Sequence, residues 1–486
     1  MKELNDKHLF CERAYLAGEW CGSADGAQIK VNNPADGRRL GSVPALDAED
    51  TRQAVAAASR AFPAWRNLLP QERAAILLDW YRLVLDNQDD LAALMTLEQG
   101  KPLAEAGGEI RYGASFIQWF AEEGKRVYGE SIHSHLPDRH LMTIREPVGV
   151  TAAITPWNFP AAMITRKAAA AMAAGCPVIV RPAMETPCSA LALAVLAERA
   201  GVPAGIFSVI TGHPEPVVGE LCRNPLVRAI SFTGSTEIGR LILSQGAATV
   251  KKMSMELGGN APFIVFPDMA LEDAVQAALA AKFQTTGQDC LAANRIFVHQ
   301  DIYESFVERF AATAARLPVG PGLKPDVALG PLIHERALAK TEAYVADALA
   351  KGARLLTGGR RHSLGGLFFE PTVLADVTAD MAIFREEVFG PVAGIMPFAD
   401  EPQVIAAANA TEYGLAAYLL TRDIGRVLRM IRALEYGMVA VNSVKLTGPP
   451  IPFGGVKQSG LGREGSRHGI AEFTELKYVC LGAGDH

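Results

Sequence analysis

The chain has 486 residues, and at roughly 150 residues per domain this length predicts about three structural units rather than one small core. Hydrophobic residues make up 49% and charged residues 21%, a globular composition that disfavours disordered, collagen-like and coiled-coil chains. The formal net charge of -6 provides no overall positive field to hold nucleic acid or an anionic membrane. Small molecules and sibling subunits are therefore the expected partners.

No targeting, membrane or metal-binding signal is evident. The first 20 residues contain no apolar run long enough for a signal peptide, which favours a cytoplasmic protein. The longest apolar stretch, 168–180, is shorter than the about 20 residues of a membrane span. The seven cysteines are odd in number, scattered and without CxxC pairs, so the sequence predicts free thiols, with no disulfide framework and no metal site.

The predicted elements begin with a helical pattern at 71–85. From residue 149 onward, short apolar segments alternate with amphipathic ones, which predicts βαβ units and a parallel sheet covered by helices on both faces. Helices are expected after Pro160, over 189–199 and over 236–244. The expected strands are 149–154, 177–180, 206–210, 228–232 and 250–256.

A second block repeats this pattern and predicts another α/β domain. Its expected helices are 271–283, 301–316 and 335–351, and its expected strands are 295–299, 391–397 and 437–442. Outside both blocks, 131–147 is less periodic and 472–481 alternates enough to form a strand. These two segments could pair as a small β appendage.

Three residues carry groups that acyl chemistry on sulfur requires. Cys290 lies in a predicted loop, Glu256 ends a predicted strand before two glycines, and Asn158 follows a strand in TPWNFP. Taken singly, each has a common structural explanation: a packing thiol, a capping or surface carboxylate, and a turn amide. Because doubly wound sheets bind ligands at the carboxyl ends of their strands, the nucleophile, carboxylate and amide together predict a catalytic site.

Two glycine-rich segments are candidates for phosphate binding. Residues 460–465 match GxGxxG, but they follow no predicted strand and leave no room for a βαβ unit, so a loop is favoured. Residues 234–239, GSTEIG, join a strand to a helix N-terminus, whose free N–H groups attract phosphate. A simple helix cap is an equal alternative there.

The motifs TPWNFP, FTGSTEIG, MELGGN, GQDC, EEVFGP and PFGGVKQSGLGRE, in this order, closely resemble the aldehyde dehydrogenase superfamily. The gap of 34 residues between Glu256 and Cys290 (290 minus 256) agrees with that family. The flanking segments PAAMITRK, GNAPFIVF and FTELKYVCLG are most similar to succinate and glutarate semialdehyde dehydrogenases.

The resemblance implies an α/β aldehyde dehydrogenase-like fold with two doubly wound parallel-sheet domains and a small β oligomerisation appendage. The cofactor-binding domain would comprise 1–130 and 147–256, and the catalytic domain 257–469. The appendage would comprise 131–146 and 470–486. Homodimers or homotetramers are expected.

The same resemblance assigns catalytic roles. Cys290 would be the nucleophile, Glu256 the general base, and Asn158 with the Cys290 backbone N–H the oxyanion hole, while Lys167 and Glu464 match supporting positions. The thiolate would add to the aldehyde, the tetrahedral oxyanion would pass hydride to nicotinamide, and water activated by Glu256 would hydrolyse the thioester.

The implied cofactor is NADP or NAD. The residues expected to bind it are Thr155, Pro156, Trp157, Arg181, Ala183, Met184, Gly234, Ser235, Leu257, Glu387 and Phe389. Relatives often have Lys and Glu where this chain has Arg181 and Met184. Without a carboxylate to repel a 2′-phosphate, and with an arginine fork, NADP should be accepted and could be preferred, although Glu185 could restore discrimination.

Substrate recognition departs most from the family pattern. Arg166 matches one arginine that grips a substrate carboxylate, but Gln284 occupies the position of the second. Asp289, directly before the nucleophile, would repel an anionic substrate and raise the thiol pKa. Either Arg111 or Lys445 could replace the missing arginine, or both could be solvated surface charges. Thr447 is also expected to contact the substrate.

The favoured function is oxidation of a small semialdehyde to its carboxylate. A cationic aminoaldehyde held by Asp289, or a neutral aldehyde, is the alternative. A cofactor-independent thiol hydrolase is disfavoured by the intact cofactor motifs. A purely structural protein is disfavoured by the presence of Cys290, Glu256 and Asn158 together.

Overall fold

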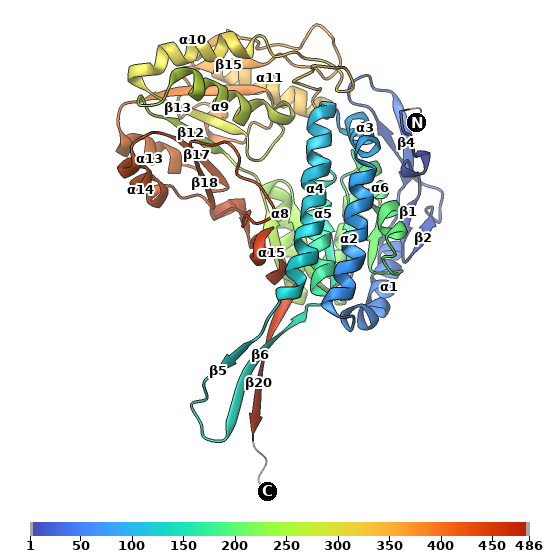
Figure 1. The fold of residues 1–486 in the computed structure, drawn as a ribbon. Coiled ribbons are helices and arrows are strands. Elements are labelled where there is room, and N and C mark those ends of the chain that lie inside the picture. Colours follow the sequence, from blue (N-terminus) through green and yellow to red (C-terminus); the bar gives the residue numbers. More distant parts are fainter. Residues whose placement is uncertain (1–2, 483–486) are drawn as a thin grey trace.

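The structure is a computed structural model that describes residues 3–482, so the last four residues of the expected appendage lie outside it. Two α/β bodies lie side by side, and a narrow ribbon of three strands projects from one of them (Figure 1). Among residues 3–482, no helix is both long and apolar enough to cross a membrane. Each of the seven cysteines is a free thiol.

The first body is built on an eight-stranded sheet in the order β19-β11-β10-β7-β8-β9-β1-β2. Its five central strands are parallel, and the chain runs outward from β7 in both directions, which places a switch point between β7 and β10. Its strands are β1 Ala14–Leu16, β2 Glu19–Cys21, β7 Val150–Ile154, β8 Val178–Arg181, β9 Phe207–Val209, β10 Val227–Thr233, β11 Lys252–Glu256 and β19 Gly460–Leu461.

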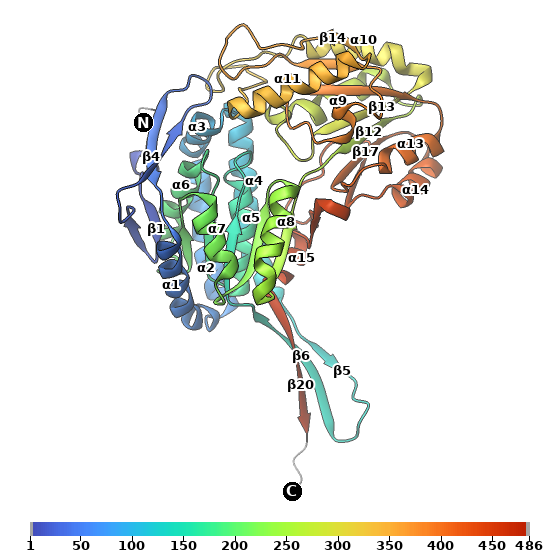
Figure 2. The same ribbon diagram turned by 180° about the vertical axis from the view of Figure 1, so that it is seen from behind.

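Helices cover both faces of this sheet. One face carries α2 Pro70–Asp86, α3 Gln88–Gln99, α4 Leu103–Glu123, α5 Ala162–Ala174 and α6 Pro187–Arg199 (Figure 1). The opposite face carries α1 Ala48–Arg66, α7 Pro214–Arg223 and α8 Thr236–Gly246 (Figure 2). A hairpin of β3 Gln28–Asn32 and β4 Arg39–Pro44 lies outside the main sheet.

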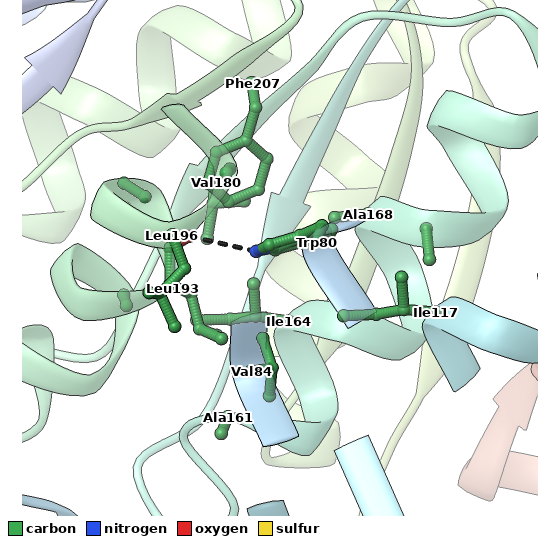
Figure 3. Packing of buried hydrophobic residues seen from close by; sticks show 14 of the residues in the cluster. Trp80, Val84, Ile117, Ala161, Ile164, Ala168, Val180, Leu193, Leu196 and Phe207 are labelled. Carbon is green, nitrogen blue, oxygen red and sulfur yellow. Dashed lines mark hydrogen bonds between the residues drawn. The ribbon is translucent and has the colours of Figure 1, made fainter. Parts of the chain in front are cut away.

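Helix α5 is enclosed by the hydrophobic core of the first body. Trp80 packs against Phe207 with ring centroids 5.4 Å apart, and its indole N–H donates to the Leu193 carbonyl at 3.2 Å (Figure 3). Ile164 and Ala168 of α5 complete this cluster. All 13 residues of α5 are buried, including two that are cationic, and Gly175 ends the helix in the left-handed conformation.

The second body contains a seven-stranded sheet in the order β14-β15-β16-β13-β12-β17-β18. Helices α9 Leu271–Phe283 and α10 Tyr303–Ala314 pack on one face, and α11 Glu335–Ala350, α12 Ala382–Arg385, α13 Glu401–Asn409 and α14 Ile424–Ala433 on the other. The strands are β12 Ala261–Val265, β13 Ala293–His299, β14 Arg354–Thr357, β15 Thr372–Ala375, β16 Val392–Phe398, β17 Ala416–Leu420 and β18 Met438–Val441.

The projecting ribbon joins β5 Glu130–Ile132, β6 Arg139–Pro147 and β20 Thr474–Gly482, with β6 in the centre. The expected pairing of the 131–147 and 472–481 segments is confirmed, with a register of nine residue pairs between β6 and β20. Helix α15 Ser466–Ala471 leads into β20. The GxGxxG segment contains the two-residue strand β19, which pairs antiparallel with β11 of the first sheet.

The predicted α/β class with two parallel sheets is confirmed, and most boundaries agree to within three residues. Strands β12 and β17 were not predicted. Both are buried at every position, so their sequences lack the alternation that marks a half-exposed strand.

Candidate active site

A cavity of about 1300 Å³ lies between the two bodies and contains the three predicted catalytic side chains. Asn158 follows β7, Glu256 ends β11, and Cys290 precedes β13 of the second sheet. The cavity therefore opens at the carboxyl ends of the first sheet, next to its switch point, where doubly wound folds bind their ligands.

The segment before the nucleophile has an unusual backbone. Thr285 and Thr286 have φ of 50° and 58°, a region that non-glycine residues adopt at a cost and that concentrates at functional sites. Glu105 of α4 holds this segment by accepting a hydrogen bond from the Thr285 N–H at 2.9 Å. A Cβ atom on Gly259 would lie 2.4 Å from the Cys290 carbonyl oxygen, so the loop that carries Cys290 leaves no room for a side chain at position 259.

Cys290 is partly buried, and its surroundings favour the neutral thiol. Burial raises the thiol pKa well above its usual value, and the carboxylates of Asp289 and Glu387 raise it further. Formation of the thiolate therefore requires a base or a bound ligand that changes this environment.

Glu256 is 2% exposed, and neither of its carboxyl oxygens has a hydrogen-bond partner within residues 3–482. Burial raises its pKa well above the usual range, and the nearby Glu464 carboxylate adds to the effect. A carboxyl group with a raised pKa near a thiol is suited to accept a proton at neutral pH.

Asn158 is held by both its side chain and its backbone. Its amide Nδ2 donates to the Gln288 carbonyl at 3.0 Å, which leaves the second amide hydrogen for another acceptor. The Asn158 carbonyl accepts a bond from Lys101 Nζ at 2.7 Å, and Lys101 forms a buried ion pair with Glu109 at 2.5 Å. Glu109 in turn accepts bonds from the N–H groups of residues 161 and 162, so α4 fixes the turn that carries Asn158.

A buried ionic cluster lies near Glu256. Arg166 Nε is 2.6 Å from Glu464 Oε2, and Lys167 Nζ donates to Glu464 and, at 3.0 Å, to Ser231. Burial would raise the pKa of Glu464, but Lys167 and Arg166 hold it below its usual range. Two cations therefore share the Glu464 carboxylate.

Arg166 is the member of this cluster that lines the cavity. Within residues 3–482, its Nη2 has only the Met163 sulfur as an acceptor, at 3.0 Å, and Nη1 is 3.4 Å from the Tyr112 hydroxyl. A thioether sulfur is a weak acceptor, so the guanidinium retains capacity for a carboxylate, which it can bind in bidentate fashion.

At the other end of the cavity, the residues fit a dinucleotide. Pro156, Trp157, Gly234, Ser235 and Leu257 line it, and the first turn of α8 offers backbone N–H groups. Trp157 and Phe389 meet edge to face with centroids 5.5 Å apart. Glu387 uses one oxygen to accept from Gly259 N at 2.9 Å, and burial raises its pKa to about 7. The cavity thus combines three features that suit a dinucleotide. Backbone N–H groups can bind its phosphates, aromatic rings can contact its bases, and a carboxyl group can bind its ribose hydroxyls.

Four residues expected at the cofactor do not line the cavity: Thr155, Arg181, Ala183 and Met184. The structure departs from the expected phosphate role of Arg181, because its Nη2 donates to the Gly212 carbonyl at 2.9 Å. Burial lowers the pKa of Arg181 to about 10. Its fork is thus directed into the protein interior.

At the substrate end, Gln284, Asp289, Lys445 and Thr447 line the cavity. Arg111 does not: it lies on the exposed side of α4, one residue before the cavity-lining Tyr112. Neighbouring residues on a helix point about 100° apart, which explains why a residue of the correct helix faces solvent. Of the two candidates for the missing arginine, the structure thus brings only Lys445 to the cavity.

Sequence reasoning missed several cavity residues on α4 and in the loop before it. Lys101, Glu105, Glu109 and Tyr112 all line the cavity. Charged residues at 101 and 109 resemble ordinary surface positions in the sequence. Only their spacing could have indicated a shared face, because residues three or four positions apart lie on the same side of a helix, as 101, 105, 109 and 112 do.

The fold and the site define a class of enzyme in which a cysteine, a buried carboxyl group and an amide share one cavity with a dinucleotide crevice. The aldehyde dehydrogenase family matches residues 20–479, and the chain belongs to this family. It is accordingly an NAD(P)-dependent oxidoreductase.

The similar proteins include semialdehyde dehydrogenases. A non-phosphorylating aspartate-semialdehyde dehydrogenase of Halomonas elongata is 60% identical, with 99% of this chain and 98% of that protein covered. A succinate-semialdehyde dehydrogenase of Escherichia coli K12, named for NADP(+), is 57% identical, with 99% and 100% covered. The crystal structure of a Burkholderia pseudomallei succinate-semialdehyde dehydrogenase has a TM-score of 0.98 at 54% identity, with 99% and 100% covered. The predicted resemblance is confirmed.

Proposed function

We propose that this enzyme oxidises short semialdehydes that carry a distal anion to the corresponding carboxylates. The observation that carries the proposal is Arg166, a 98% buried guanidinium (2% exposed) that lines the same cavity as Cys290 and has weak partners at both terminal nitrogens. The Arg166 Nε is paired with Glu464, whereas the two terminal nitrogens keep hydrogen-bonding capacity that the carboxylate of a ligand can use. The names of the similar proteins point to the same class of substrate.

Each residue of the site has a separate role in the proposed reaction. Cys290 attacks the aldehyde carbon after its thiol proton passes to Glu256. Glu256 then gives this proton up to solvent, and it accepts a second proton from the water that hydrolyses the thioester. The free amide hydrogen of Asn158 stabilises the oxyanion. When bound, the nicotinamide accepts the hydride. Glu464 holds Arg166 in place through their ion pair, and Lys167, which pairs with the same carboxylate, helps to set the charge around Glu256.

We also propose that NADP is accepted. Support comes from Met184, which provides no carboxylate against a 2′-phosphate, and not from Arg181, which donates to Gly212. Comparison of kcat/KM for the two cofactors tests this: a hundredfold preference for NAD would contradict it.

A homodimer or homotetramer joined through the projecting ribbon is part of the proposal. Leu476, Tyr478 and Leu481 of β20 are each about half exposed, and β20 is an edge strand with an unpaired side. Apolar side chains on an open edge favour pairing with another chain. Light scattering of the purified enzyme tests the oligomeric state. A monomer at all concentrations would contradict it.

The substrate proposal is tested by the pair succinate semialdehyde and butanal, which differ by the distal carboxylate. We expect kcat/KM for succinate semialdehyde to exceed that for butanal at least tenfold, and Arg166→Met to abolish this difference. The matched control is Arg111→Met, which removes an exposed cation that does not line the cavity and should leave the difference unchanged. Equal rates for both aldehydes in the wild-type enzyme would refute the proposed anion site.

A further inference from the structure

The substrate end of the cavity contains opposite charges that a simple semialdehyde leaves unexplained. Arg166 offers a positive charge for a distal anion, while Asp289 places a carboxylate beside the nucleophile. A carboxylate at that position repels a dianionic transition state and raises the pKa of Cys290. It therefore hinders the reaction unless the substrate gives it a partner.

Asp289 is available for such a partner. Its Oδ1 accepts a hydrogen bond from the Leu291 N–H at 2.9 Å, which orients the carboxylate, and the Cys290 thiol is its other hydrogen-bonding neighbour. Burial raises the pKa of Asp289, and the Leu291 N–H, Lys101, the Cys290 thiol and Arg166 lower it only in part. The other ionic groups nearby already have partners: Lys101 pairs with Glu109, and Glu105 accepts from both the N–H and the hydroxyl of Thr285.

The spacing also suits a substituent close to the reacting carbon. Residues 289 and 290 are chain neighbours, with Cα atoms about 3.8 Å apart, and both line the cavity, so a substrate bonded to the Cys290 sulfur shares that space with the Asp289 side chain. Arg166 comes from α5, a different element. Arg166 and Asp289 carry opposite charges on different elements, so they can bind an anionic and a cationic group of one short substrate.

We infer that the preferred substrate is a zwitterionic amino-acid semialdehyde, whose carboxylate binds Arg166 and whose α-ammonium group binds Asp289. This inference rests on the proposed function, because it keeps the anion site and the oxidation and adds a second recognition point. Asp289 is then the residue that distinguishes an amino-acid semialdehyde from its deaminated analogue.

Three aldehydes test the inference because they differ by one group each. Aspartate semialdehyde carries both the carboxylate and the amine, succinate semialdehyde lacks the amine, and 3-aminopropanal lacks the carboxylate. In the wild-type enzyme we expect kcat/KM to be highest for aspartate semialdehyde, by about tenfold over succinate semialdehyde, as for one charge-assisted hydrogen bond.

The decisive variant is Asp289→Asn, in which the amide oxygen can still accept from Leu291 N, so the loop keeps its support. This change also alters the Cys290 thiol, but equally for both four-carbon substrates, so the ratio of their kcat/KM values isolates recognition. We expect that ratio to fall about tenfold, and Asp289→Glu to retain part of it. Glu237→Gln, which removes a carboxylate from the α8 end of the same cavity, should leave the ratio unchanged.

The outcomes separate the two proposals. If succinate semialdehyde is oxidised well and Asp289→Asn leaves the ratio within threefold of the wild-type value, the inference is overturned and the proposed function stands. If neither carboxylate-bearing aldehyde is preferred over 3-aminopropanal and butanal, the anion site itself is wrong, and both proposals fail.

Discussion

Replacement of Glu464 by Gln should have two measurable effects. It should lower the stability of the folded protein, and it should lower the pKa of the Glu256 carboxyl group. Glu464 is the single carboxylate between Arg166 and Lys167, and it also lies close enough to Glu256 to raise its pKa. A glutamine keeps an oxygen that can accept from Lys167 and Ser231, but it removes the negative charge.

The expected loss of stability is large. Two unit charges about 4 Å apart attract by about 4 kcal/mol at an effective dielectric constant of 20, and removing one partner of a buried ion pair typically costs about 3–5 kcal/mol. Here two buried cations lose their counter-ion at once. We therefore expect the free energy of unfolding to fall by about 3 kcal/mol or more.

The same change should alter the pH dependence in a defined direction. Without the Glu464 charge, the pKa of Glu256 loses its second cause of elevation, while Arg166 and Lys167 continue to lower it. A lower pKa keeps Glu256 deprotonated at more acidic pH, so the acid limb of the kcat profile should move to lower pH. Rapid-quench measurement of thioester hydrolysis between pH 5 and 9 isolates this step from thiol addition. An acid limb that stays in place or moves to higher pH would refute the coupling.

Two further predictions concern buried groups around the site. Lys101→Met should lower kcat at least tenfold with a smaller change in KM, because the turn carrying Asn158 loses its anchor and misplacement of about 1 Å can cost 100-fold; unchanged steady-state kinetics would show that the anchor is dispensable. Burial raises the pKa of Glu98 from 4.5 to about 7, so its protonated form stabilises the folded state below pH 4.5, and about 3 kcal/mol should be lost as pH rises through 7. Denaturation curves of wild type and Glu98→Ala from pH 4.5 to 8 should therefore converge by this amount, and a pH-independent difference would contradict the assignment.

Much of the architecture was predictable because it depends on local patterns. The parallel strands of the first sheet alternate with helices whose boundaries are marked by residues such as Pro160 and Gly175, and the catalytic side chains follow those strand ends. Strands β12 and β17 were not predictable in this way, because strands buried on both faces have no polar positions to give them a period.

The site was predictable in composition but not in orientation. Cys290, Glu256 and Asn158 could be identified from their motifs, whereas the outward direction of Arg111 and the inward direction of Arg181 depend on the rotation of a helix and on a carbonyl 31 residues away. The buried Lys101–Glu109 pair was equally hidden, since two charged residues eight positions apart indicate a solvated face unless their tertiary surroundings are known.

Helix α5 has a consequence for how this enzyme could diverge. Every one of its 13 residues is enclosed, and Arg166 sits in its middle, so almost any replacement in the helix disturbs the core as well as the anion site. Asp289 and Lys445 lie instead on loops that reach the cavity from the second body, where exchange of a side chain leaves the framework intact. Changes of substrate range would therefore arise from substitutions in those loops, whereas the Arg166 site for the substrate carboxylate would be inherited almost unaltered.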